Sequence, residues 1–142
     1  MKKLEARNLC LSYASERTGG QVEALKDISF ELSPGEFVSV VGPSGCGKST
    51  LLGIIDGLLP ATSGDIFVDG KRVSEPGRDR AMVFQEASLL PWRSVLQNIT
   101  FGLECHHVSR QEAKPRAMDL IRLVGLEGFA DAYPYELSGG MQ

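Results

Sequence analysis

The stretch Gly42-Pro43-Ser44-Gly45-Cys46-Gly47-Lys48-Ser49-Thr50 decides the fold predicted for this chain. Its first eight residues match the pattern G-x-x-x-x-G-K-[S/T] in full. The stretch follows a short β-branched run, Phe37–Val41, and leads into a segment with helical periodicity, Lys48–Asp56. Glycines let the backbone bend around an anion, and a helix that begins at the loop adds the positive end of its dipole. The order strand, glycine-rich loop, helix therefore predicts a phosphate-binding loop.

The residue types in this loop favour a nucleotide as the ligand. Lys48 is expected to reach the β- and γ-phosphates of ATP, and the Ser49 hydroxyl to ligate Mg²⁺. Thr50 is expected to bond on the α-phosphate side, and Cys46 is interpreted as a small loop filler whose thiol is open to alkylation. The alternative, a chance glycine-rich turn with a surface lysine, is disfavoured because every position and both flanking elements agree.

Composition limits the other function classes. The chain has 142 residues, 42% of them hydrophobic and 23% charged, with a formal net charge of -3, which is typical of a soluble globular domain and unlike a nucleic-acid binder. No run approaches the ~20 apolar residues of a membrane-spanning helix, and the N-terminus lacks a signal-peptide pattern. Three widely spaced cysteines do not form a disulfide framework. We predict a cytoplasmic protein, and we interpret Cys105-His106-His107 as a polar stretch rather than a metal site.

The first half of the chain reads mainly as β-structure. Strands are expected at Leu4–Tyr13, Leu25–Leu32 and Ala81–Phe84, with a polar loop over residues 14–21. Pro34-Gly35 suits a type II turn, and Asp69-Gly70 after an apolar strand predicts a hairpin. The helix at Lys48–Asp56 is expected to bury Leu51, Leu52 and Ile55 and to end at Gly57.

The second half has helical periodicity. Ser109 and Glu112 fit a capping box, although Pro115 suggests that the regular helix begins nearer Lys114. A single apolar face is expected beyond that point, ending at Gly125 and made by Ala113, Ala117, Leu120, Ile121 and Val124.

A second glycine-rich motif stands at Leu137-Ser138-Gly139-Gly140-Met141-Gln142. Ser138 offers a hydroxyl, Gly139 and Gly140 offer unobstructed N–H groups, and a helix is expected to begin here, which would make another anion site. Together with the phosphate loop, this motif makes the whole chain resemble the ATPase subunits of ABC transporters, whose signature is LSGGQ or a close variant.

The resemblance implies a site shared between two subunits. In that family two ATPase subunits face each other head to tail, and the signature of one closes on the γ-phosphate held by the other's phosphate loop. Tyr13 matches the aromatic residue that stacks on adenine, and Gln85 matches the Q-loop glutamine that touches Mg²⁺ and senses the transmembrane partner. The partners implied are transmembrane permease subunits and, indirectly, a periplasmic or lipid-anchored solute-binding protein, at the inner face of the membrane and without nucleic acid.

The fold class implied is α/β, a P-loop NTPase core with an N-terminal antiparallel β subdomain and the start of an α-helical subdomain. We place the β subdomain and phosphate-loop core at 1–91 and the helical subdomain at 92–142. The run Val83–Trp92 resembles the importer branch for nitrate, sulfonates or taurine, although an ATPase subunit carries little information about its cargo.

Family members are expected to continue for roughly a hundred residues more, judged from ordinary domain size. The Walker B strand with its Mg²⁺-binding Asp and catalytic Glu, the D-loop and the switch His would lie there, so no catalytic residue is predicted within these 142 residues. The strand at Phe37–Val41 would then have an exposed apolar edge. We predict that the isolated chain is poorly soluble and has no steady-state ATPase activity.

Three alternatives remain. A DNA-repair type of ABC ATPase is disfavoured by the acidic balance and by the compact stretch without heptads between Gln85 and Ser138. A truncated, non-catalytic ATP-binding or dimerisation module stays open, because the catalytic residues are not present. A small-molecule phosphotransferase is disfavoured by Leu137–Gln142.

Overall fold

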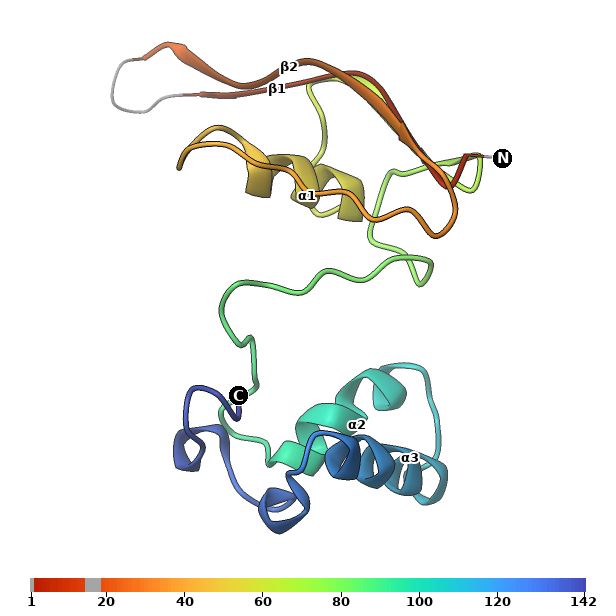
Figure 1. The fold of residues 1–142 in the computed structure, drawn as a ribbon, viewed down its shortest axis with the longest axis vertical. Helices are drawn as coiled ribbons and strands as arrows, with labels where there is room; N and C mark the ends of the chain where they lie inside the picture. The colour runs from red at the N-terminus through yellow and green to blue at the C-terminus, as the bar shows by residue number, and fades with distance from the viewer. Residues whose placement is uncertain (1, 15–18) are drawn as a thin grey trace. The chain divides into compact units, whose positions relative to one another are not determined.

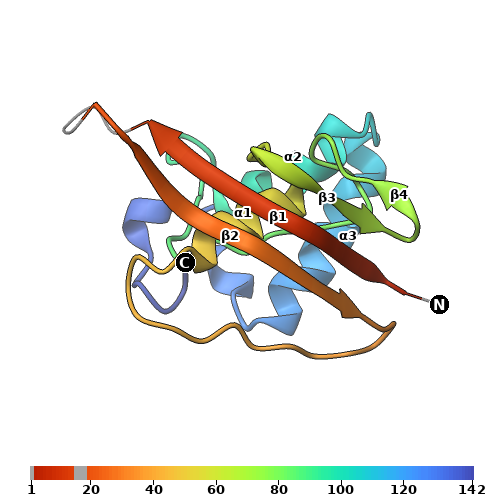
Figure 2. The same cartoon turned by 90° about the horizontal axis from the view of Figure 1, so that it is seen from above.

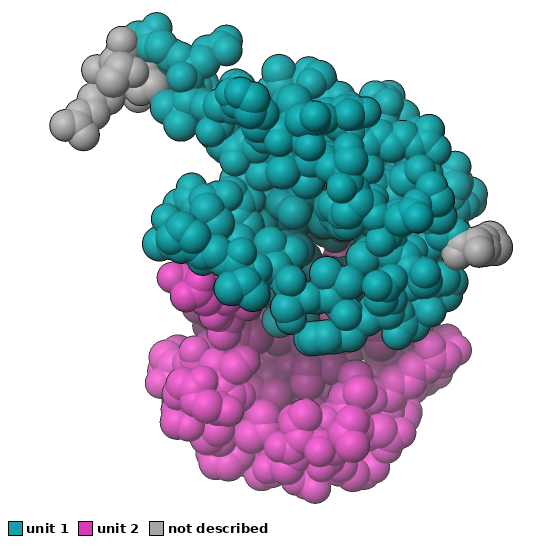
Figure 3. All heavy atoms as spheres, turned by 45° about the horizontal axis from the view of Figure 1, so that its top comes forward, with its two compact units in different colours: residues 1–83 teal, residues 84–142 magenta. Residues whose placement is uncertain are grey.

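The computed structural model describes residues 2–14 and 19–142 of the chain. The chain folds as two compact units, residues 1–83 and residues 84–142, which are coloured separately in Figure 3. The division falls after Val83, and the subdomain boundary placed after Pro91 stays a prediction.

The first unit is built on an antiparallel sheet with the strand order β2-β1-β3-β4 (Figure 2). The strands are β1 Leu4–Ala14, β2 Gln21–Leu32, β3 Ser63–Val68 and β4 Lys71–Arg72. Both N-terminal strands and the hairpin at Asp69-Gly70 are confirmed; these two residues have φ of 50° and 76°, as a type I′ turn requires. Half of the loop predicted at 14–21, residues 15–18, lies outside the described residues.

One helix covers one face of this sheet (Figures 1 and 2). Helix α1 spans Lys48–Asp56, as predicted, and ends at Gly57, which has a φ of 83°. Its Leu51 and Ile54 pack against inward-facing strand residues such as Leu9, which is completely buried. The predicted apolar face was wrong at Leu52, which is 46% exposed. The side of α1 that faces the sheet carries Leu51 and Ile54, and Leu52 lies outside it.

Two predicted strands are absent from the described part of the chain. Phe37–Val41 and Ala81–Phe84 have no regular secondary structure. A β-branched run becomes a strand only where a neighbour satisfies its backbone N–H and C=O groups, and the described residues offer neither segment a pairing partner. Phe37, Val41 and Val83 are accordingly 91%, 90% and 96% exposed. Residues 37–41 are therefore exposed as expected, but as irregular chain and not as the edge of a strand.

The type II turn before Phe37 is confirmed, since the Glu36 N–H donates to Ser33 O at 3.2 Å and Gly35 has a φ of 77°.

The second unit is helical, with α2 at Val95–Cys105, α3 at Arg110–Leu123 and two short 3₁₀ turns, η1 at Glu127–Phe129 and η2 at Pro134–Glu136. The capping box predicted at Ser109 does not form, since Ser109 is the N-cap of α3 but its side chain makes no capping hydrogen bond. The box forms at α2 instead, between Ser94 and Gln97. None of the helices described is both long and apolar enough to cross a bilayer.

Helix α3 differs from its prediction in two further respects. It begins at Arg110 rather than near Lys114 and includes Pro115, so that it lacks one backbone hydrogen bond inside the helix. Its buried positions form a narrow stripe at intervals of four residues, made by Ala113, Ala117 and Ile121. The other two residues of the predicted face, Leu120 and Val124, are 52% and 63% exposed because they lie beside this stripe. Gly125 ends the helical segment with a φ of 71°, as predicted.

Candidate nucleotide-binding site

The phosphate loop holds its lysine against the loop's own backbone. The Lys48 ammonium donates hydrogen bonds to Gly42 O at 2.8 Å and to Pro43 O at 2.7 Å, and it lies 3.5 Å from the Cys46 Sγ. No carboxylate forms an ion pair with Lys48 within residues 2–14 and 19–142. The ammonium is therefore placed at the loop with its charge uncompensated, and an anionic ligand can replace the two carbonyls as its partner.

Two glycines give the loop its shape. Gly45 and Gly47 have φ of 81° and 93°, in the left-handed region, and Gly47 is the N-cap of α1. The first backbone bond of the helix follows at once, from the Leu51 N–H to Gly47 O at 2.8 Å. The N-terminal amides of α1 therefore open toward the loop, with no acidic residue in the first turn to compete for them.

These features fit the phosphates of a nucleotide. Residues 42–46 and Ser49 are exposed, so the backbone amides and the Ser49 hydroxyl are accessible. A lysine, a run of loop amides and a hydroxyl are the donor and ligand set that a Mg²⁺-bound triphosphate requires. The contact of Lys48 with the terminal phosphates and the binding of Mg²⁺ by Ser49 stay predictions.

Gly47 is the position where substitution should damage the loop most. A Cβ there would lie 2.6 Å from Ala24 O and 2.9 Å from the Leu25 Cδ2 on β2, in addition to the cost of its positive φ. We expect Gly47→Ala to lower the free energy of unfolding by about 2–4 kcal/mol and to weaken ATP binding. Gly70→Ala is the matched control, because Gly70 has a φ of 76° but nothing within 4 Å of the added Cβ. Urea denaturation of the full-length protein measures both, and an equal loss for the two variants would contradict the close contact at Gly47.

The two remaining residues predicted to contact the nucleotide belong to different units. Tyr13, near the end of β1, is opposite Val22 on β2 and is 43% exposed, which leaves its ring available for stacking. Gln85 belongs to the second unit and is exposed. Their contacts with adenine and Mg²⁺ stay predictions.

The signature motif divides into buried and exposed residues. Leu137 is buried and Met141 is half-buried, whereas Ser138, Gly139 and Gly140 are exposed. The helix expected to begin here is only a single turn in this structure, closed by the Met141 N–H donating to Ser138 O at 2.9 Å. Ser138, Gly139 and Gly140 thus lie at the surface between two apolar residues, Leu137 and Met141, that pack into the second unit.

The sequence did not indicate which residues stabilise the signature motif and the segment that follows Gln85. Asn98 and the Arg93–Glu104 ion pair, at 2.8 Å, were not singled out. Arg93 also lies over the Phe101 ring at 4.9 Å, and its hydrogen bond to Glu104 lowers the pKa of that carboxyl below its usual value. The order Ser94-x-x-Gln97 before an apolar run is a capping box and could have located the start of α2, but no local signal indicated the contacts of Asn98.

Comparison with known proteins agrees with this geometry. A family model described as ABC transporter matches residues 25–142. An uncharacterized ABC transporter ATP-binding protein of Methanocaldococcus jannaschii, MJ0412, is 52% identical over 140 residues, covering 99% of this chain and 52% of the relative. The taurine import ATP-binding protein TauB of Rhizobium johnstonii is 52% identical over 92% of this chain and 50% of the relative. The nitrate import ATP-binding protein NrtD of a Synechocystis strain is 50% identical over 98% of this chain and 52% of the relative.

A solved structure shares the fold. The dimeric structure of MJ0796, a bacterial ABC transporter cassette, superposes with a TM-score of 0.83 at 31% identity, covering 96% of this chain and 64% of the other. The same cassette is also known as a dimer in a post-hydrolysis state bound to ADP and Pi, with a TM-score of 0.81. The chain spans about half the length of the curated relatives described above. From its phosphate loop, its second glycine-rich motif and these matches, the chain belongs to the ABC transporter family.

Proposed function

We propose that this chain supplies the phosphate loop and the signature of an ATP-hydrolysing subunit that drives solute import. The observation that carries the proposal is Lys48, which is held at the mouth of the phosphate loop by two backbone carbonyls and has no carboxylate partner among the residues described. MgATP, when bound, supplies the phosphoanhydride bond whose hydrolysis drives transport.

The chain's own residues divide the work between two copies. Gly42–Thr50 holds the phosphates and contributes Ser49 to Mg²⁺, with Gln85 as a second Mg²⁺ contact. Ser138, Gly139 and Gly140 of the facing subunit approach the γ-phosphate, since they are the exposed part of the signature. Support for two head-to-tail subunits comes from the dimeric cassette that the chain resembles.

The cargo proposed is a small oxyanion of the nitrate or sulfonate class. The support is the naming of relatives that are about half identical to this chain as taurine or nitrate import ATP-binding proteins. Permease subunits would anchor the ATPase to the inner face of the membrane, and a solute-binding protein would deliver the cargo.

The test is ATP hydrolysis by the full-length protein, reconstituted in vesicles with its permease and its solute-binding protein. We expect taurine or nitrate to stimulate hydrolysis and to accumulate in the vesicles in an ATP-dependent manner. Sulfate and an amino acid serve as comparison solutes. Hydrolysis that responds to neither taurine nor nitrate would contradict the cargo class, and absence of nucleotide binding would contradict the proposal as a whole.

A further inference from the structure

We propose that Asn98 is a positioning residue that, through the first turn of α2, joins the segment after Gln85 to the signature as one rigid body. The inference rests on the proposed role of the signature in closing a partner's nucleotide site. All of its contacts lie within the second unit.

The N-terminus of α2 is capped by the chain that leads into the signature. The first amides of a helix have no partner within it and need acceptors from elsewhere. Here the Val95 N–H donates to Ala132 O at 2.8 Å, and the Leu96 N–H donates to Ala130 O at 2.9 Å. The Gln97 N–H is satisfied by the Ser94 hydroxyl at 3.4 Å. The position of the 130–132 segment is thus fixed by hydrogen bonds to α2.

The first turn of α2 also holds residues 90–94, through the side chain of Asn98. The Asn98 Oδ1 accepts from the Leu90 N–H at 2.8 Å. Its Nδ2 lies within hydrogen-bond distance of Leu90 O at 3.2 Å, Arg93 O at 2.9 Å and Ser94 O at 3.0 Å. One amide side chain therefore fastens residues 90–94 to the helix, and no other side chain bonds so many backbone groups in the part of the chain that the structure describes.

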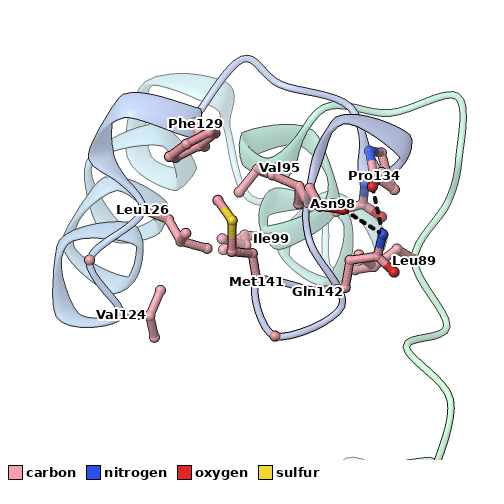
Figure 4. A pocket seen from close by; sticks show the side chains of 13 residues that line it. Leu89, Val95, Asn98, Ile99, Val124, Leu126, Phe129, Pro134, Met141 and Gln142 are labelled. Carbon is pink, nitrogen blue, oxygen red and sulfur yellow. Dashed lines mark hydrogen bonds between the residues drawn. The ribbon is translucent and has the colours of Figure 1, made fainter.

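Apolar contacts extend the connection to the signature itself. Val95 of α2 and Leu137 of the signature are buried in one cluster with Ile121, and Met141 packs against it. The Gln142 Nε2 donates to Pro134 O at 2.6 Å, which ties the end of the motif to η2. A largely apolar cavity of about 610 Å³ lies beside this cluster. Figure 4 shows Val95, Met141 and Gln142 among the side chains that line it, together with Asn98 from the same helix as Val95.

These contacts determine how the second unit can move. A displacement of residues 90–94 must carry α2 with it, because moving the segment alone would take from the half-buried Leu90 and Arg93 the hydrogen bonds of their carbonyls to Asn98. A displacement of α2 must carry Ala130 and Ala132, and with them Leu137. A signal received after Gln85 therefore reaches Ser138–Gly140 through Asn98, without a change of conformation between them.

The test compares Asn98→Ala with Thr100→Val in the full-length protein. Thr100 is a buried polar residue on the same helix, but its hydroxyl bonds only Gln97 O and Glu104, within α2. The affinity for ADP measures binding by the phosphate loop alone. Dimerisation with a nonhydrolysable ATP analogue measures how well the signature of one subunit closes on the nucleotide of the other. We expect Asn98→Ala to weaken dimerisation about tenfold with ADP affinity unchanged, and Thr100→Val to change neither.

Hydrogen exchange provides the second measurement. We expect Asn98→Ala to speed exchange at the amides of Leu90, Leu96 and Met141 together, and Asn98→Asp, which keeps the Oδ1 acceptor but has no amide donor, to do the same if the alanine variant folds poorly. Faster exchange at Leu90 alone, with unaltered dimerisation, would overturn the inference. If the unaltered protein binds ADP but does not dimerise, the proposed function fails instead, which keeps the two outcomes distinct.

Discussion

Lys48→Ala is expected to weaken MgATP binding to the full-length protein by about 10- to 100-fold, because a charge-assisted hydrogen bond contributes about 1.5–3 kcal/mol. The Lys48 ammonium is already positioned by Gly42 O and Pro43 O, so the ligand does not have to order a mobile side chain. Removing it deletes the positive charge at the loop and leaves the glycine geometry intact.

Isothermal titration with MgATP measures this effect. Lys26→Ala is the matched control, because the Lys26 side chain is 81% exposed on β2 and should leave the affinity unchanged. An affinity for MgATP that is the same in Lys48→Ala as in the unaltered protein would show that the loop does not bind the terminal phosphates.

Gly139→Asp is expected to abolish nucleotide-dependent dimerisation, with a loss of about 100-fold or more, and to leave ADP affinity unchanged. Gly139 is exposed, and a Cβ added there meets nothing within 4 Å, so the fold tolerates the substitution. A carboxylate that faces a partner's γ-phosphate would repel it at close range, at a cost of several kcal/mol.

Sedimentation velocity with a nonhydrolysable ATP analogue distinguishes monomer from dimer. Gly128→Asp is the control, since Gly128 is also exposed, lies in the same unit and has nothing within 4 Å of an added Cβ. Dimerisation that survives Gly139→Asp, or that is lost equally in Gly128→Asp, would remove the reason for assigning Gly139 to the interface.

Local patterns predicted the elements whose partners are close in sequence. Lys48–Asp56, Gly57 and the Asp69-Gly70 hairpin were recognised because a glycine with positive φ or a helical repeat determines them locally. The candidate site could be proposed from the sequence for the same reason, since each of its glycine-rich motifs is contiguous in the chain.

Some elements that depend on distant partners were not predicted correctly. Phe37–Val41 has the composition of a strand, but pairing decides whether a strand forms. Leu120 fits a helical repeat and is nevertheless exposed, because the neighbour of α3 determines which stripe is buried. Asn98 was missed because nothing in its local sequence indicates that it bonds residues 90–94.

We propose that each nucleotide site is completed by a second subunit. Mixing Lys48→Ala with Gly139→Asp tests it most directly, because each variant lacks a different half of the site. A head-to-tail pair of the two contains one site with both halves intact, from the phosphate loop of one chain and the signature of the other.

The measurement is dimer formation with the nonhydrolysable ATP analogue, for each variant alone and for the equimolar mixture. We predict little dimer from either variant alone and a clear gain in the mixture, in which only the heterodimer forms. A mixture that dimerises no better than the two separate variants would contradict a site shared between subunits.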